Sequence, residues 1–164
     1  MFILCECILF ILIFLFDRNW LRYASILICF LYSIYTRKGY GIMFLIVLAD
    51  YCLVMRENYF IGVALFMNVQ ALYYYQMTKN FHLFYALFFC LGYSLYLLGI
   101  VYAVMSLVNI YVAYRTRHWL LITLLLLGAC DICVMIQYLW FYSLPILWFF
   151  YLFSQVYYLK MVSA

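Results

Sequence analysis

Short polar clusters divide this chain into eight apolar segments. Within the segments apolar residues run on without the strict alternation of a β-barrel strand, so helices are the better interpretation. We predict an all-α integral membrane protein of about eight short transmembrane helices, forming a single domain over residues 1–164. The segments are approximately 2–16, 21–35, 41–55, 60–77, 82–98, 100–114, 119–136 and 143–159.

The segments are short for membrane helices. Most contain 15–18 residues, whereas a normal span needs about 20, although interfacial Tyr, Trp, Arg and Lys can extend the effective length. The fifth and sixth segments are separated only by Gly92 and Gly99. One long kinked helix, giving seven spans in all, is the alternative to the two tight spans that we prefer.

The composition makes lipid the expected solvent. Of 164 residues, 74% are hydrophobic and only 9% are charged, whereas soluble domains carry about 25% charged residues. Aromatic residues make up 24% of the chain, including 20 Tyr, and Tyr and Trp favour the membrane–water interface. The net charge of +4 comes from basic residues in short loops, which indicates a role in topology and not in nucleic-acid binding.

The basic residues also predict an orientation, because cytoplasmic loops carry an excess of Lys and Arg. With eight spans, six basic residues lie on the side of both termini and three lie on the opposite side. We therefore expect a multi-pass protein of the cell membrane with both termini in the cytoplasm. The first group is Arg37, Lys38, Lys79, Arg115, Arg117 and Lys160, and the second is Arg18, Arg22 and Arg56.

The cysteines and histidines do not form the pattern of a metal site or a disulfide framework. All seven cysteines lie in apolar runs and are interpreted as small buried apolar residues. Cys130 and Cys133 have C-x-x-C spacing, but the sequence has no second pair and no histidine near them. Neither His82 nor His118 lies in a span beside a carboxylate, so we expect no metal and no cofactor.

Two aspartates, Asp50 and Asp131, lie inside apolar segments. An ionisable side chain at membrane depth costs about 2.5–3.5 kcal/mol on insertion scales, so it indicates a functional site by default. Asp50 begins the sequence DYCLVM and Asp131 begins DICVM; in the predicted topology both lie at similar depth in the outer half of the membrane. The match suggests two four-helix halves in parallel orientation, which would place a site between the halves.

Other polar residues at membrane depth are interpreted as helix–helix hydrogen bonds or interface anchors. They are Asn68, Gln70, Asn109, Ser154 and Gln155. Glu6 lies close enough to the end of the first span for its side chain to reach the interface.

Two carboxyl groups in one apolar pocket cannot both ionise easily, because burial and mutual repulsion disfavour full ionisation. One group can stay protonated as a general acid while the other remains an ionised base, as in glycosidases. The same division of labour suits cleavage of a vinyl ether, in which an acid protonates the alkene carbon and a base helps water to add. It suits proton-coupled transport equally well, so the aspartates alone do not select an enzyme.

The surroundings of both aspartates resemble the signatures of the YhhN-like family of membrane proteins, which includes the lysoplasmalogenases. The stretch LADYCLVMRENYFIGVALFMNVQALYY supplies Asp50, Leu53, Phe60, Gly62, Phe66 and Tyr73 at the spacing of the first signature. The stretch GACDICVMIQYLWFYSLPILWFFYLFSQVYYL supplies Gly128, Asp131, Pro145, Tyr151 and Gln155 for the second. The resemblance covers essentially the whole chain.

The resemblance implies eight spans and a hydrolase of lipid metabolism that cleaves the vinyl ether bond of a lysoplasmalogen, a lysophospholipid held in the bilayer. It implies that Asp50 and Asp131 form the acid/base pair. It further implies that other residues orient water, headgroup or aspartates. These substrate-binding residues are Gln70, Tyr73, Tyr151 and Gln155. The oligomeric state is left open.

The chain departs from the family pattern at three places. Ala49 stands where the family has Gly, Gln70 stands where it has His, and Ser25-Ile26 stands where it has Lys-Pro. Glutamine cannot transfer protons near neutral pH. A non-catalytic lipid-binding protein or proton-coupled carrier of the same family is therefore the alternative to the hydrolase, and a structural subunit of a larger complex is a third.

Overall fold

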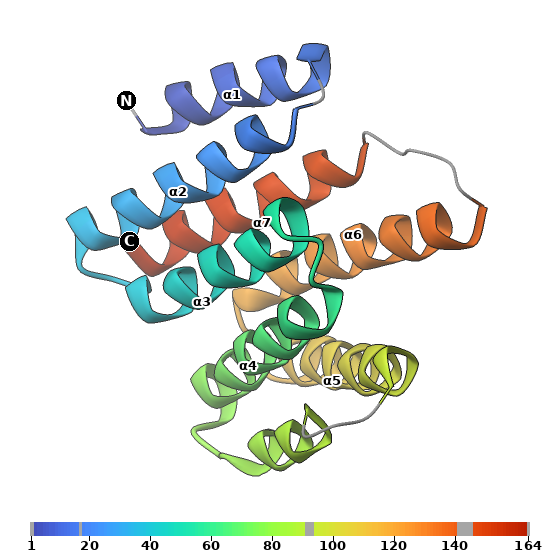
Figure 1. Ribbon diagram of the computed structural model, residues 1–164. Helices are drawn as coiled ribbons and strands as arrows, with labels where there is room; N and C mark the ends of the chain where they lie inside the picture. Colours follow the sequence, from blue (N-terminus) through green and yellow to red (C-terminus); the bar gives the residue numbers. More distant parts are fainter. Residues whose placement is uncertain (1, 17, 91–93, 141–145, 164) are drawn as a thin grey trace. The chain divides into compact units, whose positions relative to one another are not determined.

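The computed structural model describes residues 2–16, 18–90, 94–140 and 146–163, leaving aside the side chains of 88–90 and 138–140. Every described element is helical (Figure 1), which confirms the all-α prediction. The elements are α1 (Phe2–Phe16), α2 (Asn19–Thr36), α3 (Tyr40–Asp50) with the π-helical turn η1 (Tyr51–Met55), α4 (Tyr59–Thr78), the 3₁₀ helix η2 (His82–Cys90), α5 (Leu95–Arg115), α6 (Leu120–Trp140) and α7 (Ile146–Ser163).

The polar clusters that separate the apolar segments form the ends of the helices. Arg37 and Lys79 follow α2 and α4 in the left-handed conformation, with φ of 55° and 58°, and their N–H groups bond to carbonyls of the last turn. At the start of α4, the Asn58 side chain accepts a hydrogen bond from Ile61 N–H at 3.2 Å. Such caps satisfy backbone groups that have no partner inside the helix.

The predicted boundary between the fifth and sixth segments is wrong. Gly99 lies inside α5, which begins at Leu95 because Ser94 caps it by accepting a hydrogen bond from Leu97 N–H at 3.4 Å. An isolated glycine weakens a helix but does not end it. The fifth segment contains the nine-residue 3₁₀ helix η2, which at about 2.0 Å per residue is too short to cross a hydrocarbon layer of about 30 Å. Gly92, the other predicted break, lies outside the described residues.

The helices fall into two compact units, which are described separately. One unit, here called the terminal unit, contains Met1–Tyr40 and Ile122–Ala164, and the other, the central unit, contains Gly41–Leu121. These units differ from the two sequence halves that the repeated aspartate context suggests, because the terminal unit joins both ends of the chain.

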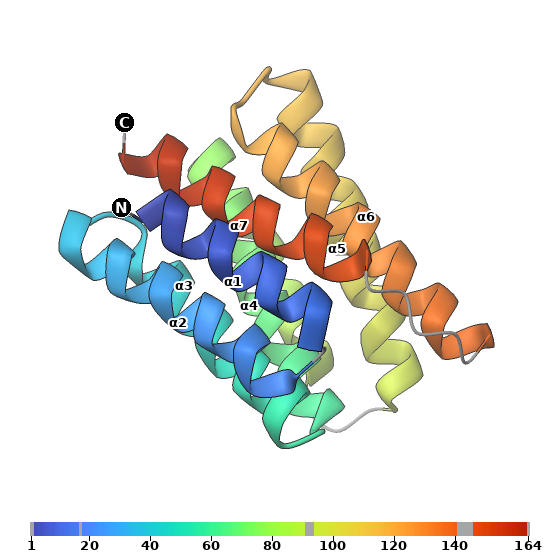
Figure 2. The same ribbon diagram turned by 90° about the horizontal axis from the view of Figure 1, so that it is seen from above.

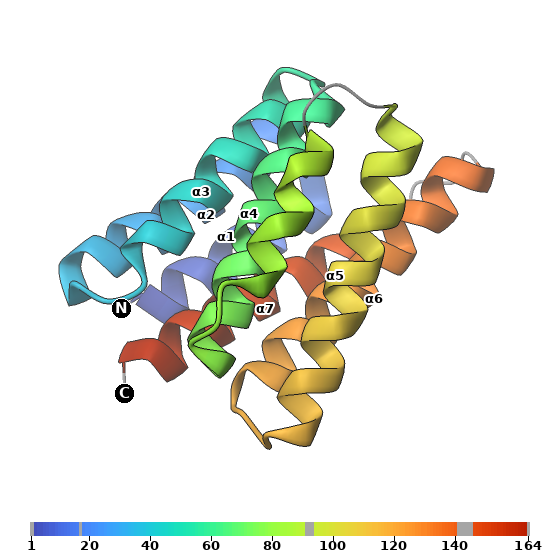
Figure 3. The ribbon, with the colours of Figure 1, turned by 90° about the horizontal axis from the view of Figure 1, so that it is seen from below.

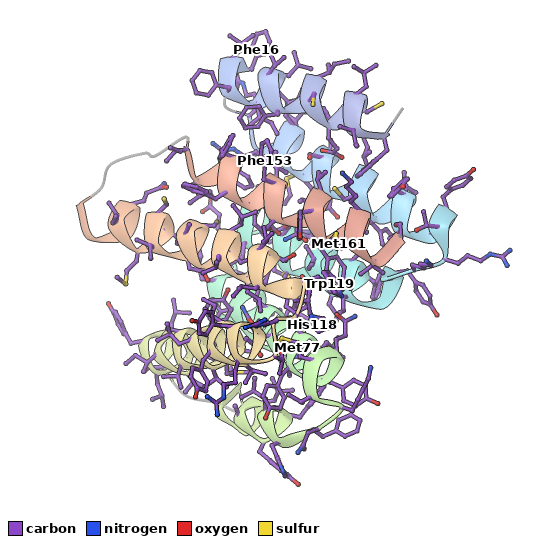
Figure 4. The ribbon with its side chains drawn as sticks, turned by 180° about the vertical axis from the view of Figure 1, so that it is seen from behind. Phe16, Met77, His118, Trp119, Phe153 and Met161 are labelled. Atoms are coloured by element: carbon purple, nitrogen blue, oxygen red, sulfur yellow. The ribbon has the colours of Figure 1, made fainter. Side chains whose placement is uncertain are left out.

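In the terminal unit, α2 contacts α1 and α7, and Figure 2 shows α1 running alongside α2. Aromatic rings fill the contact between α1 and α7, where Phe10 lies 5.7 Å from Phe149 and 6.3 Å from Phe153, measured between ring centroids; Phe153 is labelled in Figure 4. The Arg22 guanidinium of α2 lies 4.5 Å from the ring centre of Trp148 on α7. Packing among these helices therefore links segments from both ends of the sequence.

The turn after α2 also packs on α7. Gly39 has φ of +68°, and a Cβ atom at this position would lie 3.2 Å from the Tyr158 ring and hydroxyl. Glycine is favoured here because it adopts the left-handed conformation without steric cost and leaves room for the tyrosine. The neighbouring Lys38 Nζ donates a hydrogen bond to the Ser163 carbonyl at 3.1 Å.

In the central unit, α4 packs against α5, and η2 lies against both (Figure 3). The buried core of this contact is formed by Met67 and Ala71 of α4 with Leu98 and Met105 of α5. Gly62 brings α4 close to η1, because a Cβ atom there would lie 2.4 Å from Leu53 Cγ. The glycine of the first family signature thus occupies a position of close packing.

By length and composition alone, two described helices are long and apolar enough to cross a membrane, Leu95–Arg115 and Leu120–Gln137. On α5, Ile100, Val104, Leu107 and Tyr111 recur every three or four residues and are 54–66% exposed. A continuous exposed apolar stripe is a feature of surfaces that contact lipid or another protein.

Candidate functional site

Asp50 is the last residue of α3, and only 4% of its surface is exposed. The helix then changes its winding, because Arg56 N–H bonds to the Tyr51 carbonyl five residues earlier at 3.1 Å, the spacing of a π-helix. Single π-helical turns inside α-helices are frequent at functional sites. Asp50 thus joins two features of a site: a buried carboxyl group in an apolar helix and an irregular backbone turn beside it.

Gln70 and Tyr73 lie one turn apart on α4 and are 1% and 0% exposed. Asn109 of α5 donates through Nδ2 to the Gln70 side-chain oxygen at 2.6 Å and to the Gln70 carbonyl at 2.8 Å. Gln70 and Asn109 therefore act as a hydrogen-bonded link between α4 and α5, the role predicted for these amides from the sequence.

The orientation of the Asn109 amide is fixed by its partners. The Gln70 carbonyl can only accept, so the NH₂ group of Asn109 must face it, and Oδ1 faces the other way. Among the described residues, Asn109 Oδ1 and Ser106 Oγ are buried without a hydrogen-bond partner. Ser106 lies one turn before Asn109 on the same face of α5, so this part of the helix interface contains unused hydrogen-bonding capacity.

Asp131 lies in the apolar middle of α6 and is half-buried, whereas its neighbours Cys130 and Cys133 are buried cysteines outside any disulfide. In the described parts of the chain, no three His, Cys, Asp or Glu side chains gather into a group that could hold a metal ion. The environment of Asp131 is therefore more open than that of Asp50.

Tyr151 and Gln155, the predicted substrate-binding residues of α7, are 5% and 0% exposed. Ser154 connects them, since its hydroxyl donates to the Tyr151 carbonyl at 2.6 Å and accepts from Gln155 Nε2 at 3.2 Å. Gln155 Oε1 is buried and, among the described residues, has no hydrogen-bond partner. Pro145, which also belongs to the second family signature, lies outside the described residues.

The predicted site residues divide between the two units. Asp50, Gln70 and Tyr73 belong to the central unit, and Asp131, Tyr151 and Gln155 belong to the terminal unit. All except Asp131 are buried. The pairing of the two aspartates in one site stays a prediction.

The prediction for Glu6 is wrong. Its side chain does not reach out to the interface but is 5% exposed, and its carboxyl group accepts hydrogen bonds from Ser25 and Cys29 of α2. The reason is that α1 and α2 pack as antiparallel helices, in which Glu6 lies as many residues before the end of α1 as Cys29 lies after the start of α2. This equal spacing is the sequence signal that could have located the contact.

His118 lies in the turn between α5 and α6, where its ring is 5.3 Å from that of Trp119 (Figure 4). Its Nδ1 accepts a hydrogen bond from Leu120 N–H at 3.2 Å, at the beginning of α6. Partial burial and the positive charge of Lys79 lower the pKa of His118 below its ordinary value of 6.5. Both effects favour the neutral imidazole, which is the form that can accept the capping hydrogen bond.

In comparisons with known proteins, no family model, no curated protein and no solved structure matches this chain. The likeness to the YhhN-like family rests on the spacing of residues such as Asp50, Gly62 and Asp131 in the sequence.

Proposed function

We propose that this chain is a multi-pass membrane hydrolase that cleaves the vinyl ether bond of lysoplasmalogen-type lysophospholipids. The observation that carries the proposal is the buried carboxyl group of Asp50 at the π-helical turn of an apolar helix. A carboxyl group is retained at such a position, despite its cost, mainly for function. Asp131, the second aspartate within an apolar helix, is its proposed partner.

In the proposed reaction, one aspartic acid protonates the alkene carbon that bears the alkyl chain, and positive charge develops at the carbon bound to the ether oxygen. The second, ionised aspartate takes a proton from the water that adds to this carbon. The resulting hemiacetal breaks down to a fatty aldehyde and a glycerophospho-alcohol. Gln70, Tyr73, Tyr151 and Gln155 are proposed to orient water and headgroup, and no metal or cofactor takes part.

The proposed setting is the cell membrane, crossed by several of the apolar helices. The exposed apolar stripe of α5 and the length of α5 and α6 support membrane insertion.

The test is aldehyde release from a lysoplasmalogen by purified protein in lipid–detergent micelles. We expect Asp50→Asn and Asp131→Asn each to lower kcat by at least about 100-fold, because a general acid or base contributes roughly 10²–10⁴-fold. Glu57→Gln is the matched control, since Glu57 is an exposed carboxylate in the loop after η1. No turnover by folded wild-type protein, or full turnover in either Asn variant, would refute the hydrolase with this acid/base pair.

The second candidate is a lipid-binding protein or proton-coupled carrier without catalysis. The hydrogen bonds of Gln70 favour it, because at the position of the family histidine this side chain is bonded to Asn109 and cannot transfer protons. Binding of a fluorescent lysophospholipid to folded protein without aldehyde release would distinguish this candidate from the hydrolase.

A further inference from the structure

The contact between α1 and α2 contains a buried carboxyl group that the proposed hydrolysis does not use. Ser25 Oγ donates to Glu6 Oε2, and Cys29 Sγ donates to Glu6 Oε1 at 3.5 Å. Ser25 and Cys29 are four residues apart, so they lie on one face of α2. Glu6 is 5% exposed and its two partners are fully buried, so all three groups are separated from water.

Within the described parts of the chain, Glu6 has no positively charged partner. Its hydrogen bonds are to the Ser25 hydroxyl and the Cys29 thiol. The basic residue nearest along α2, Arg22, lies over the Trp148 ring and donates to Asn19 Oδ1 at 2.9 Å. On α7, the third helix of this contact, Lys160 is exposed in the last turn.

A carboxylate in this position would be a buried charge with only neutral hydrogen-bond donors. Two such donors offset part of the cost of removing the charge from water, but an ionised group without a counter-charge remains strongly unfavourable in apolar surroundings. Taking up a proton removes the charge. The neutral acid can still use both partners, because a hydroxyl group accepts as well as donates.

We propose that Glu6 is a proton-binding site of the α1–α2 helix pair. The ligand is a proton, which the carboxyl group holds in the resting protein and shares in a hydrogen bond with Ser25 Oγ. The Cys29 thiol donates to the other carboxyl oxygen and positions the group. The site does not depend on Asp50 or Asp131, so it does not rest on the proposed hydrolysis.

Infrared difference spectroscopy on the full chain in lipid vesicles at neutral pH tests the proposal. We expect the wild-type spectrum minus that of Glu6→Gln to contain the carbonyl stretching band of a protonated carboxylic acid. Glutamine is close in shape to the neutral acid and keeps both contacts, so the variant should fold with unchanged helical circular dichroism. A difference spectrum with only the bands of an ionised carboxylate would overturn the proposal.

Two further variants make the assignment specific. In Ser25→Ala the acid band should remain but move to higher frequency, because the hydrogen bond to Ser25 is lost; an unmoved band would contradict the proposed geometry. This variant also tests the proposal if Glu6→Gln fails to fold. Glu57→Gln is the matched control and should remove only ionised-carboxylate bands, since Glu57 is exposed. If the acid band disappeared in Glu57→Gln, the band would not belong to Glu6, and the proposal would be overturned.

Discussion

The hydrogen-bonded link between α4 and α5 allows a quantitative test of the packing in the central unit. Asn109→Leu keeps the branched shape of the side chain but removes both hydrogen bonds, at 2.6 Å and 2.8 Å, to the Gln70 side chain and carbonyl. Side-chain hydrogen bonds between membrane helices contribute about 0.6 kcal/mol each on average. Two bonds therefore contribute roughly 1.2 kcal/mol.

Two smaller effects have opposite signs. The Gln70 side-chain oxygen would become a buried acceptor without a donor, which costs about 1 kcal/mol or more. Asn109 Oδ1 is buried without a hydrogen-bond partner among the described residues, so its removal should stabilise the folded variant by a similar free energy. The free energy of unfolding should therefore fall by about 1–2 kcal/mol.

The assay is unfolding in mixed micelles titrated with a denaturing detergent, followed by circular dichroism. Asn68→Leu is the matched control. Asn68 lies on α4, and its side chain donates at 2.9 Å to the Ala64 carbonyl of the same helix, so among the described residues it makes no hydrogen bond between helices. This control should lose less than about 0.5 kcal/mol. Gln70→Leu combined with Asn109→Leu should cost about 1 kcal/mol less than the sum of the single changes, since the polar pair is then removed together. Equal stability of Asn109→Leu and wild type, or strict additivity, would refute the reasoning.

Two other features give further predictions. Gly62→Ala should lower the free energy of unfolding by about 1–3 kcal/mol, because the added Cβ atom would lie 2.4 Å from Leu53 Cγ; Gly99→Ala, with open space at its Cβ position, should raise it by roughly 0.5–1 kcal/mol in the same detergent titration. The pKa of His118 is lowered in the folded protein by burial and by Lys79, so its contribution to stability should be complete above pH 6.5 and decrease as pH falls below that value, because the unfolded chain takes up the proton first. Unfolding titrations at several pH values should show this loss in wild type but not in His118→Asn, and the same pH dependence in both proteins would contradict the assignment.

The apolar runs predict the helices well, because a long run of apolar residues can satisfy its backbone groups only internally. They do not predict helix type or the start of α5. The segment His82–Cys90 is as apolar as its neighbours but forms a 3₁₀ helix, and a single capping serine, Ser94, decides that α5 begins before Gly99. A single capping residue hardly changes the hydropathy of a segment, so the hydropathy pattern does not locate a helix start of this kind.

The sequence predicts a residue of the candidate site only where that residue can be identified without knowing which other helices it contacts. The cost of a carboxyl group in an apolar helix identifies Asp50 without knowledge of its neighbours. Glu6 is different, because its burial depends on the rotation of α1 against α2, which decides whether Ser25 and Cys29 face it. Contacts between helices are set by packing of two surfaces, and the sequence of one helix does not contain that information.

The terminal unit has a consequence for the order in which the protein is made. The hydrogen bond from Lys38 to Ser163 joins residues 125 positions apart, and α2 packs on α7, which is synthesised long after α2. The central unit, Gly41–Leu121, is continuous in sequence and can assemble while synthesis continues. During that interval α1 and α2 lack their partner helix, so a ribosome stalled before residue 146 would leave their α7-facing surface available to lipid or to chaperones of membrane insertion.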